Sequence, residues 1–228
     1  MAHSFRYLIL LLAGVLPAFA QAPAPPQPVR FTVFSARPIA DLSFVPRANA
    51  APQKLVFYPT ARSPRYEYRG AAPLRFAEAA TGRVVAEANI PADVRDALLL
   101  FVPIEPAPAS GLRYQISVLD DGAARHGPGG LAIINLSGLA LSGTVGPHAV
   151  ILKAGLNPTL AVGNAAKIVL RTALKNRTYQ SYADAVEMDR NQRALLILFP
   201  PYYRGSLEVQ SRMLLDEPPV APRPAPPR

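Results

Sequence analysis

Short apolar or alternating runs recur along most of the chain, and turn residues lie between them. Runs of this length, rich in aliphatic, β-branched and aromatic side chains, are typical of β-strands. The predicted strands are 29–34, 54–58, 66–69, 83–90, 97–104, 112–119, 131–136, 149–153, 166–174, 179–186, 194–199 and 206–214. Helical periodicity is sustained nowhere, although residues 91–100 could begin with one helical turn. The pattern predicts an all-β protein and argues against a fold of alternating strands and helices.

The clearest alternation lies in residues 112–119. Leu112, Tyr114, Ile116 and Val118 share one face of this predicted strand, and polar residues occupy most of the other. Strict alternation of this kind indicates a strand with one face in a core. We therefore expect the opposite face of its sheet to contact water.

The two halves of the chain resemble one another at an offset of roughly a hundred residues, which favours an internal repeat. The matched segments are 95–103 with 193–200, the predicted hairpins 74–90 with 168–186, and the opening strands 31–35 with 133–137. An acidic pair follows the last strand of each half, at 120–121 and at 216–217.

This repeat predicts two tandem immunoglobulin-like β-sandwich units, at 29–125 and 130–217, with an exposed break at 126–130. Two alternatives stay open. Any two β segments can be aligned by apolar pattern, and the repeated strands could belong to one shared sheet.

The strand that ends in Asp120-Asp121, the Pro-Gly loop, the Ile-Ile-Asn-Leu-Ser-Gly run and the later strand 193–200 resemble a family of exported bacterial β-sandwich proteins with no assigned activity. The resemblance covers about residues 97–215. It implies export and a β fold, and it transfers no catalytic residue.

The first residues have the features of a secretory signal peptide. Arg6 precedes an apolar run from Leu8 to Phe19, and Ala18-Phe19-Ala20 suits a signal peptidase. We expect residues 1–20 to be removed, so that the mature chain is exported to the periplasm or the medium and keeps no transmembrane segment. The alternative is an uncleaved anchor. The Pro-rich linker 21–28 and tail 218–228 are predicted to be disordered, because proline lacks the N–H that a sheet requires.

Composition excludes several kinds of chemistry. The chain of 228 residues contains no cysteine and no tryptophan, and its formal charge is +9. Disulfides, thiolate nucleophiles and iron–sulfur clusters are therefore absent. His126 and His148 alone cannot supply the three or four ligands of a usual zinc site, so we expect no metal and no cofactor, and we place both histidines in surface loops. Asp120-Asp121 is interpreted as a turn. A Ser-His-Asp set brought together from distant segments stays open.

Arginine, lysine and tyrosine gather in two places, and such mixtures can bind phosphate or stack on sugar rings. The candidate anion-binding or ligand-binding residues are Arg62, Arg65, Tyr66, Tyr68 and Arg69 in the first half, and Arg171, Lys175, Arg177 and Tyr179 in the second. The competing interpretation is that these side chains simply cover the solvated faces of strands.

These observations predict an exported, non-enzymatic binding or scaffold protein of the bacterial cell envelope. Its expected partner is an anionic envelope component or another envelope protein, and not nucleic acid, which suits the charge but not the compartment. The alternative is an envelope hydrolase or carbohydrate-active enzyme. A deep pocket with converging carboxylates or a Ser-His pair would favour the enzyme, and flat sheet faces would favour binding.

Overall fold

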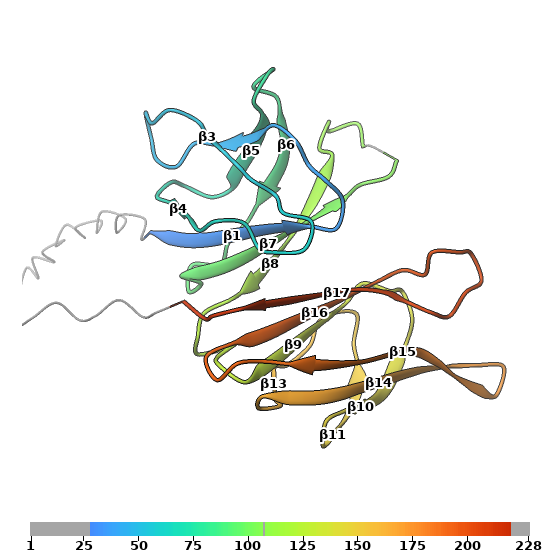
Figure 1. Cartoon of the computed structure of the whole chain (residues 1–228). Helices are drawn as coiled ribbons and strands as arrows, with labels where there is room; N and C mark the ends of the chain where they lie inside the picture. Colours follow the sequence, from blue (N-terminus) through green and yellow to red (C-terminus); the bar gives the residue numbers. More distant parts are fainter. Residues whose placement is uncertain (1–27, 107, 220–228) are drawn as a thin grey trace, which may run out of the picture.

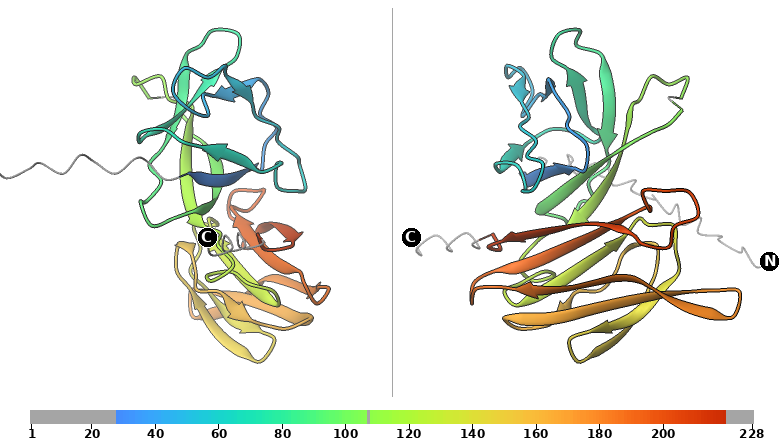
Figure 2. Two further views of the ribbon diagram at one scale, coloured as in Figure 1. Left: turned by 90° about the vertical axis from the view of Figure 1, so that its left-hand side faces the viewer. Right: turned by 45° about the vertical axis from the view of Figure 1, so that its right-hand side comes forward.

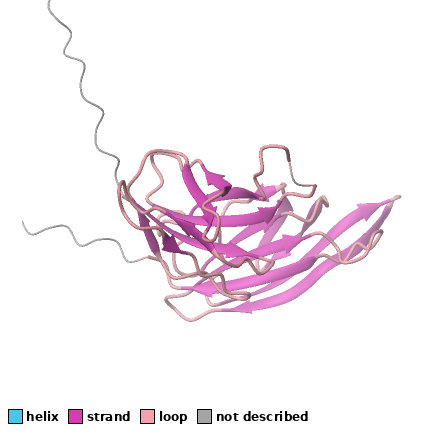
Figure 3. Cartoon of the chain, turned by 90° about the horizontal axis from the view of Figure 1, so that it is seen from above, coloured by secondary structure: helices cyan, strands magenta, loops and turns pink. Residues whose placement is uncertain are grey.

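The computed structural model describes residues 28–106 and 108–219 (Figure 1). Seventeen strands in this range form four sheets, and none of the described residues forms a helix (Figure 3). The all-β prediction is confirmed, and the sheets pack face to face as in a β-sandwich. The predicted signal peptide, most of the linker 21–28 and most of the tail 218–228 lie outside the described residues.

Two four-stranded sheets form from the N-terminal half, residues 28–125. The first has the order β4-β1-β7-β8, and the second has the order β3-β2-β5-β6. Their bounds are β1 Val29–Ser35, β2 Leu42–Phe44, β3 Gln53–Lys54, β4 Tyr66–Tyr68, β5 Leu74–Glu78, β6 Val84–Ala88, β7 Asp96–Pro103 and β8 Tyr114–Asp120. β1 and β7 are parallel, with Val33 opposite Leu99, and the other pairings are antiparallel.

The C-terminal half, residues 126–219, repeats this strand order. One sheet runs β12-β9-β16-β17, with β13 also paired to β9, and the other runs β11-β10-β14-β15. Their bounds are β9 Gly130–Asn135, β10 Leu141–Val145, β11 His148–Leu152, β12 Gly155–Leu156, β13 Leu160–Ala161, β14 Ala165–Leu174, β15 Arg177–Glu187, β16 Arg193–Phe199 and β17 Gln210–Asp216. β9 and β16 are parallel, as are β1 and β7.

Each pair of sheets encloses its own core. In the N-terminal half the core is aromatic: the ring centroids of Phe31 and Phe44 lie 5.1 Å apart, as do those of Phe76 and Phe101, with edge-to-face geometry. Such pairs stabilise a core beyond their buried area. The core of the C-terminal half is largely aliphatic and is centred on residues such as Ile133.

A third apolar cluster joins the two halves, and we call it the seam. It comprises Phe34, Leu98, Leu100, Leu119, Ala132, Ile134, Leu195, Ile197 and Leu214 as its buried members. These residues belong to β1, β7 and β8 on one side and to β9, β16 and β17 on the other. Figure 2 shows the blue-to-green half stacked on the yellow-to-red half. Since both faces of β7 and β16 are covered, their residues form continuous apolar runs and do not alternate.

The seam corrects one expectation. The face of β8 opposite the core was predicted to contact water, and Gln115 is indeed exposed. Leu119 on the same face is only 6% exposed, however, because it packs in the seam. Four other strands, β2, β10, β12 and β13, were not predicted because they are short or carry weak alternation. The segment from Pro91 to Val94 forms one hydrogen-bonded turn before β7.

Candidate functional site

Arg193 lies at the start of β16 and its side chain is completely buried beside the seam. Nε and Nη2 donate to the Asp216 carboxylate at 3.1 and 3.0 Å, and Nη2 also donates to Asp121 Oδ2 at 2.7 Å. Nη1 donates to the main-chain oxygens of Asp121 at 2.8 Å and His126 at 2.9 Å. A guanidinium has five N–H groups, so these five hydrogen bonds compensate its burial.

Arg62 reaches the same cluster from the segment before β4. Its side chain is 6% exposed, and Nη1 donates to Asp121 Oδ2 at 2.5 Å. Its Nε lies 3.4 Å from Asp216 Oδ1. Two arginines therefore balance two aspartates, and we call Arg62, Asp121, Arg193 and Asp216 the seam quartet. This position removes Arg62 from the predicted surface site.

The quartet controls the ionisation of Asp121. Burial alone would raise the pKa of this carboxyl group. The neighbouring His126 and the positive charges of Arg62 and Arg193 outweigh burial and hold the pKa well below its usual range. Asp121 is therefore ionised at neutral pH and is committed to ion pairs.

His126 was expected in a surface loop, but it is only 4% exposed. Its Nε2 lies 2.9 Å from the main-chain oxygen of Ala194 and 3.3 Å from that of Gly130, and Nδ1 lies 3.7 Å from Asp121 Oδ1. The expected exposed break at 126–130 therefore begins with a buried residue. His148 Nε2 likewise contacts a main-chain oxygen, that of Ala161, at 2.9 Å. Neither described histidine is hydrogen-bonded to a serine.

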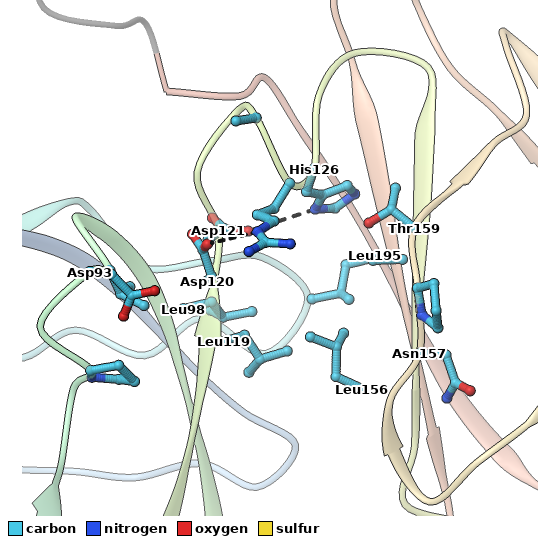
Figure 4. A pocket seen from close by; sticks show the side chains of 16 residues that line it. Asp93, Leu98, Leu119, Asp120, Asp121, His126, Leu156, Asn157, Thr159 and Leu195 are labelled. Atoms are coloured by element: carbon cyan, nitrogen blue, oxygen red, sulfur yellow. Dashed lines mark ion pairs between the residues drawn. The ribbon is translucent and has the colours of Figure 1, made fainter.

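A hollow of about 680 Å³ opens between the two halves next to the quartet. Figure 4 shows Leu98, Leu119, Leu156 and Leu195 gathered between the two halves in this hollow. Three aspartates and His126 also line it. Asp121 is committed to the quartet, and Asp120 Oδ2 lies 3.5 Å from Arg125 Nε. The third aspartate is Asp93. Within residues 28–106 and 108–219, no three His, Asp or Glu side chains gather as a metal site would require.

The remaining first-half candidates separate onto two faces of β4. Tyr66 packs in the aromatic core at 6% exposure, and its hydroxyl accepts a hydrogen bond from the Val56 N–H at 2.8 Å. Tyr68 is half-buried, and its hydroxyl donates to the main-chain oxygen of Ala71. Arg65 and Arg69 alternate with these tyrosines and are exposed. They are the first-half candidates that offer charge to a ligand.

The structure adds Arg47, which no sequence pattern indicated. Arg47 lies in the connection between β2 and β3 and forms a parallel β-bridge with Arg69, whose N–H donates to the Pro46 oxygen at 2.8 Å. Arg47, Arg65 and Arg69 line one hollow of about 580 Å³, together with Pro46, Ala50, Gln53, Tyr66 and Glu67. We call it the basic hollow. The contact between residues 47 and 69 is non-local, which is why the sequence could not reveal it.

The charges of the basic hollow are only partly compensated. Arg69 Nε pairs with Glu67 Oε1 at 2.5 Å, and Arg65 Nη1 lies 4.0 Å from Asp96 Oδ1, at the limit of an ion pair. Arg47 pairs with no acidic side chain of the part of the chain that the structure describes. Three arginines therefore line the hollow, against one acidic residue, Glu67.

A second hollow, of about 700 Å³, is also lined by residues of the β2–β3 connection and shares Arg47 with the first. Its walls are mostly small and apolar, with Val45, Ala48, Ala71, Pro73, Ala77 and Val84 among them. We call it the apolar hollow.

The second-half candidates do not converge. Lys175 and Asn176 form the tip of the β14–β15 hairpin with positive φ angles of 48° and 61°. Tyr179 pairs with Thr172 and Arg177 with Leu174, so these four residues share one face of the hairpin. Arg171, next to Thr172, belongs to the opposite face. Figure 1 places the hairpin tip far from β4, so the two predicted sets form no common site.

No protein-family model matches this chain, and no curated protein does. Among the described residues no helix is long and apolar enough to cross a membrane. The features of the described residues that suit a ligand or partner are the two hollows beside Arg47 and the hollow at the seam.

Proposed function

We propose that this chain is an exported, non-enzymatic binding or scaffold protein of the bacterial cell envelope, which associates with anionic envelope components through the basic hollow. The observation that carries the proposal is the convergence of Arg47, Arg65 and Arg69 around one hollow. A guanidinium is always charged, and its planar N–H groups match carboxylate and phosphate oxygens. Three such groups against Glu67 leave the hollow positive.

The rest of the chain supports an anionic partner. The formal charge of +9 becomes +8 when residues 1–20, with Arg6, are removed, and it attracts anions over the distance of a Debye length. The predicted signal peptide would deliver it to a compartment that contains anionic lipids and glycans rather than nucleic acid. Another envelope protein with an acidic surface fits the same site.

We also propose that the two halves are tandem immunoglobulin-like units, with the sequence boundaries 29–125 and 130–217. The repeated strand order and the two separate cores support this assignment. The seam and its quartet would hold the units in one orientation, which suits a rigid scaffold.

The alternative, an envelope hydrolase or carbohydrate-active enzyme, draws its support from the seam hollow, which Asp93 and Asp120 line together with several leucines. A hydrolase needs an acid and a base positioned about one reacting bond. The nearby Asp121 and His126 make structural contacts instead. Binding at the basic hollow is therefore the better-supported function.

Sedimentation with lipid vesicles tests the proposal. The chain that begins at Gln21 is mixed with anionic or zwitterionic vesicles across a salt series. The variant Arg47→Gln/Arg65→Gln/Arg69→Gln is compared with Arg171→Gln/Lys175→Gln/Arg177→Gln, which removes the same charge from the hairpin. We expect salt-sensitive binding to anionic vesicles, lost in the first variant and retained in the second. Equal binding by both variants, or binding that ignores salt, would refute the site.

A further inference from the structure

Arg47 lines both the basic hollow and the apolar hollow, so one arginine borders a cationic and an apolar concavity. The β2–β3 connection carries it between them. Both hollows open on the N-terminal half and neither includes a seam residue. A ligand could therefore enter them without disturbing the contact between the halves.

The other charged side chains of the apolar hollow are already paired. Lys54 Nζ lies 2.6 Å from Asp41 Oδ1, Arg75 Nε lies 3.0 Å from Glu87 Oε1, and Glu78 Oε1 lies 2.5 Å from Arg113 Nη1. Arg47 is thus the one charged group of the apolar hollow that no described residue pairs. An anion that enters the apolar hollow would therefore pair with Arg47.

The walls of the apolar hollow indicate what accompanies the anion. Val45 is 45% exposed, although burial of its side chain would be favourable. The hollow has a volume of about 700 Å³, within the range of small-molecule sites, which are mostly apolar with a few placed polar groups. A purely polar glycan would leave this surface in water, and a neutral hydrocarbon would leave Arg47 without a partner.

We propose that the ligand is a single-chain anionic amphiphile, whose hydrocarbon chain occupies the apolar hollow and whose carboxylate binds Arg47 at the edge of the basic hollow. This inference rests on the proposed function, because it names the ligand class of the same site. Arg65 and Arg69 add attraction for the head group. Because the basic hollow is positively charged, we expect it to bind an anionic head group and to repel that of a cationic detergent.

Isothermal titration calorimetry with octanoate, decanoate and dodecanoate, each below its micelle concentration, tests the apolar part. Each buried methylene should tighten binding by about fourfold. Dodecyltrimethylammonium, which has the same chain and the opposite charge, should not bind. Affinity that is independent of chain length, or equal binding of the cationic probe, would overturn the inference.

Two substitutions test the site itself. Arg47→Gln should weaken dodecanoate binding by roughly tenfold to a hundredfold, because a charge-assisted hydrogen bond is lost. Val45→Asn, which adds a polar group but no charge, should weaken dodecanoate binding but leave binding of inorganic phosphate unchanged. Arg177→Gln, an equal loss of charge at the hairpin, is the matched control and should bind as the wild type does. The chain-length series on the wild type decides the question even if a variant fails to fold.

The outcomes separate this inference from the proposed function. If anionic vesicles bind in a salt-dependent way and the fatty acids do not bind, the ligand class is wrong and the anion-binding function stands. If neither fatty acids, phosphate nor anionic vesicles bind, both fail.

Discussion

Arg193 and Asp121 meet through both the side chain and the main chain: Arg193 Nη2 donates to Asp121 Oδ2 at 2.7 Å, and Nη1 donates to the Asp121 main-chain oxygen at 2.8 Å. One residue begins β16 and the other follows the end of β8, 72 positions earlier. Because the guanidinium binds the turn as well as the carboxylate, the pair ties the path of the connection to the C-terminal half. The two halves are therefore held by directed ion pairs in addition to apolar contact.

Removing Arg193 should destabilise the fold strongly. Arg193→Ala would leave the buried Asp121 and the half-buried Asp216 with Arg62 alone, and loss of one partner of a buried ion pair typically costs about 3–5 kcal/mol. Urea unfolding of the variant and the wild type at pH 7 measures the loss. The exposed Arg190→Ala is the control and should stay within about 0.5 kcal/mol. A loss below about 1 kcal/mol for Arg193→Ala would show that the quartet adds little to stability.

The quartet also predicts a dependence of stability on acid. The pKa of Asp121 is lowered in the folded state, so its contribution is present above the unfolded value of about 3.9 and is lost as the pH falls below it. Unfolding free energies of the wild type and Asp121→Asn, measured from pH 7 to pH 2, should differ most at pH 7. The difference in unfolding free energy should shrink at lower pH, because the Asp121 carboxyl group of the unfolded chain protonates first. A difference that stays constant over this range would contradict the pKa assignment.

The seam should make the halves unfold together. Phe34 is completely buried and belongs to the apolar cluster that joins the two halves. Differential scanning calorimetry of the chain is therefore expected to give one transition. Phe34→Ala should reduce the free energy of unfolding by about 3–5 kcal/mol and therefore lower the temperature of this transition. Tyr202→Ala, at an exposed position, should leave it unchanged. Two separate transitions in the wild type would mean that the halves are energetically independent.

Local pattern was sufficient for much of the fold. The β prediction and the repeat of segment 95–103 in 193–200 rest on alternation and run length, which depend on neighbouring residues. The observed strands β7 and β16 occupy equivalent places in the two halves. The continuous apolar character of these strands was itself a signal that both of their faces are buried. This apolar character predicts that the second face of each strand is buried, but it does not predict which part of the protein covers that face.

The candidate site was predictable only in part. Arg65 and Arg69 were identified from the sequence, and they line the basic hollow. Arg62 lies only three positions before Arg65, yet its guanidinium turns into the seam to meet Asp121. Arg47 has no distinguishing neighbours in the chain, and it joins the site through its bridge to Arg69.

The sequence by itself determined most of the strands, the order in which they repeat, the chain's basic charge and two of the three arginines of the basic hollow. The tertiary structure decided which sheet faces meet, which charges are buried, and that Arg47 stands between two hollows. The reason is physical. Alternation reports how a strand divides its side chains between two faces, whereas an ion pair between residues 121 and 193 or a bridge between 47 and 69 exists only after distant segments have packed together.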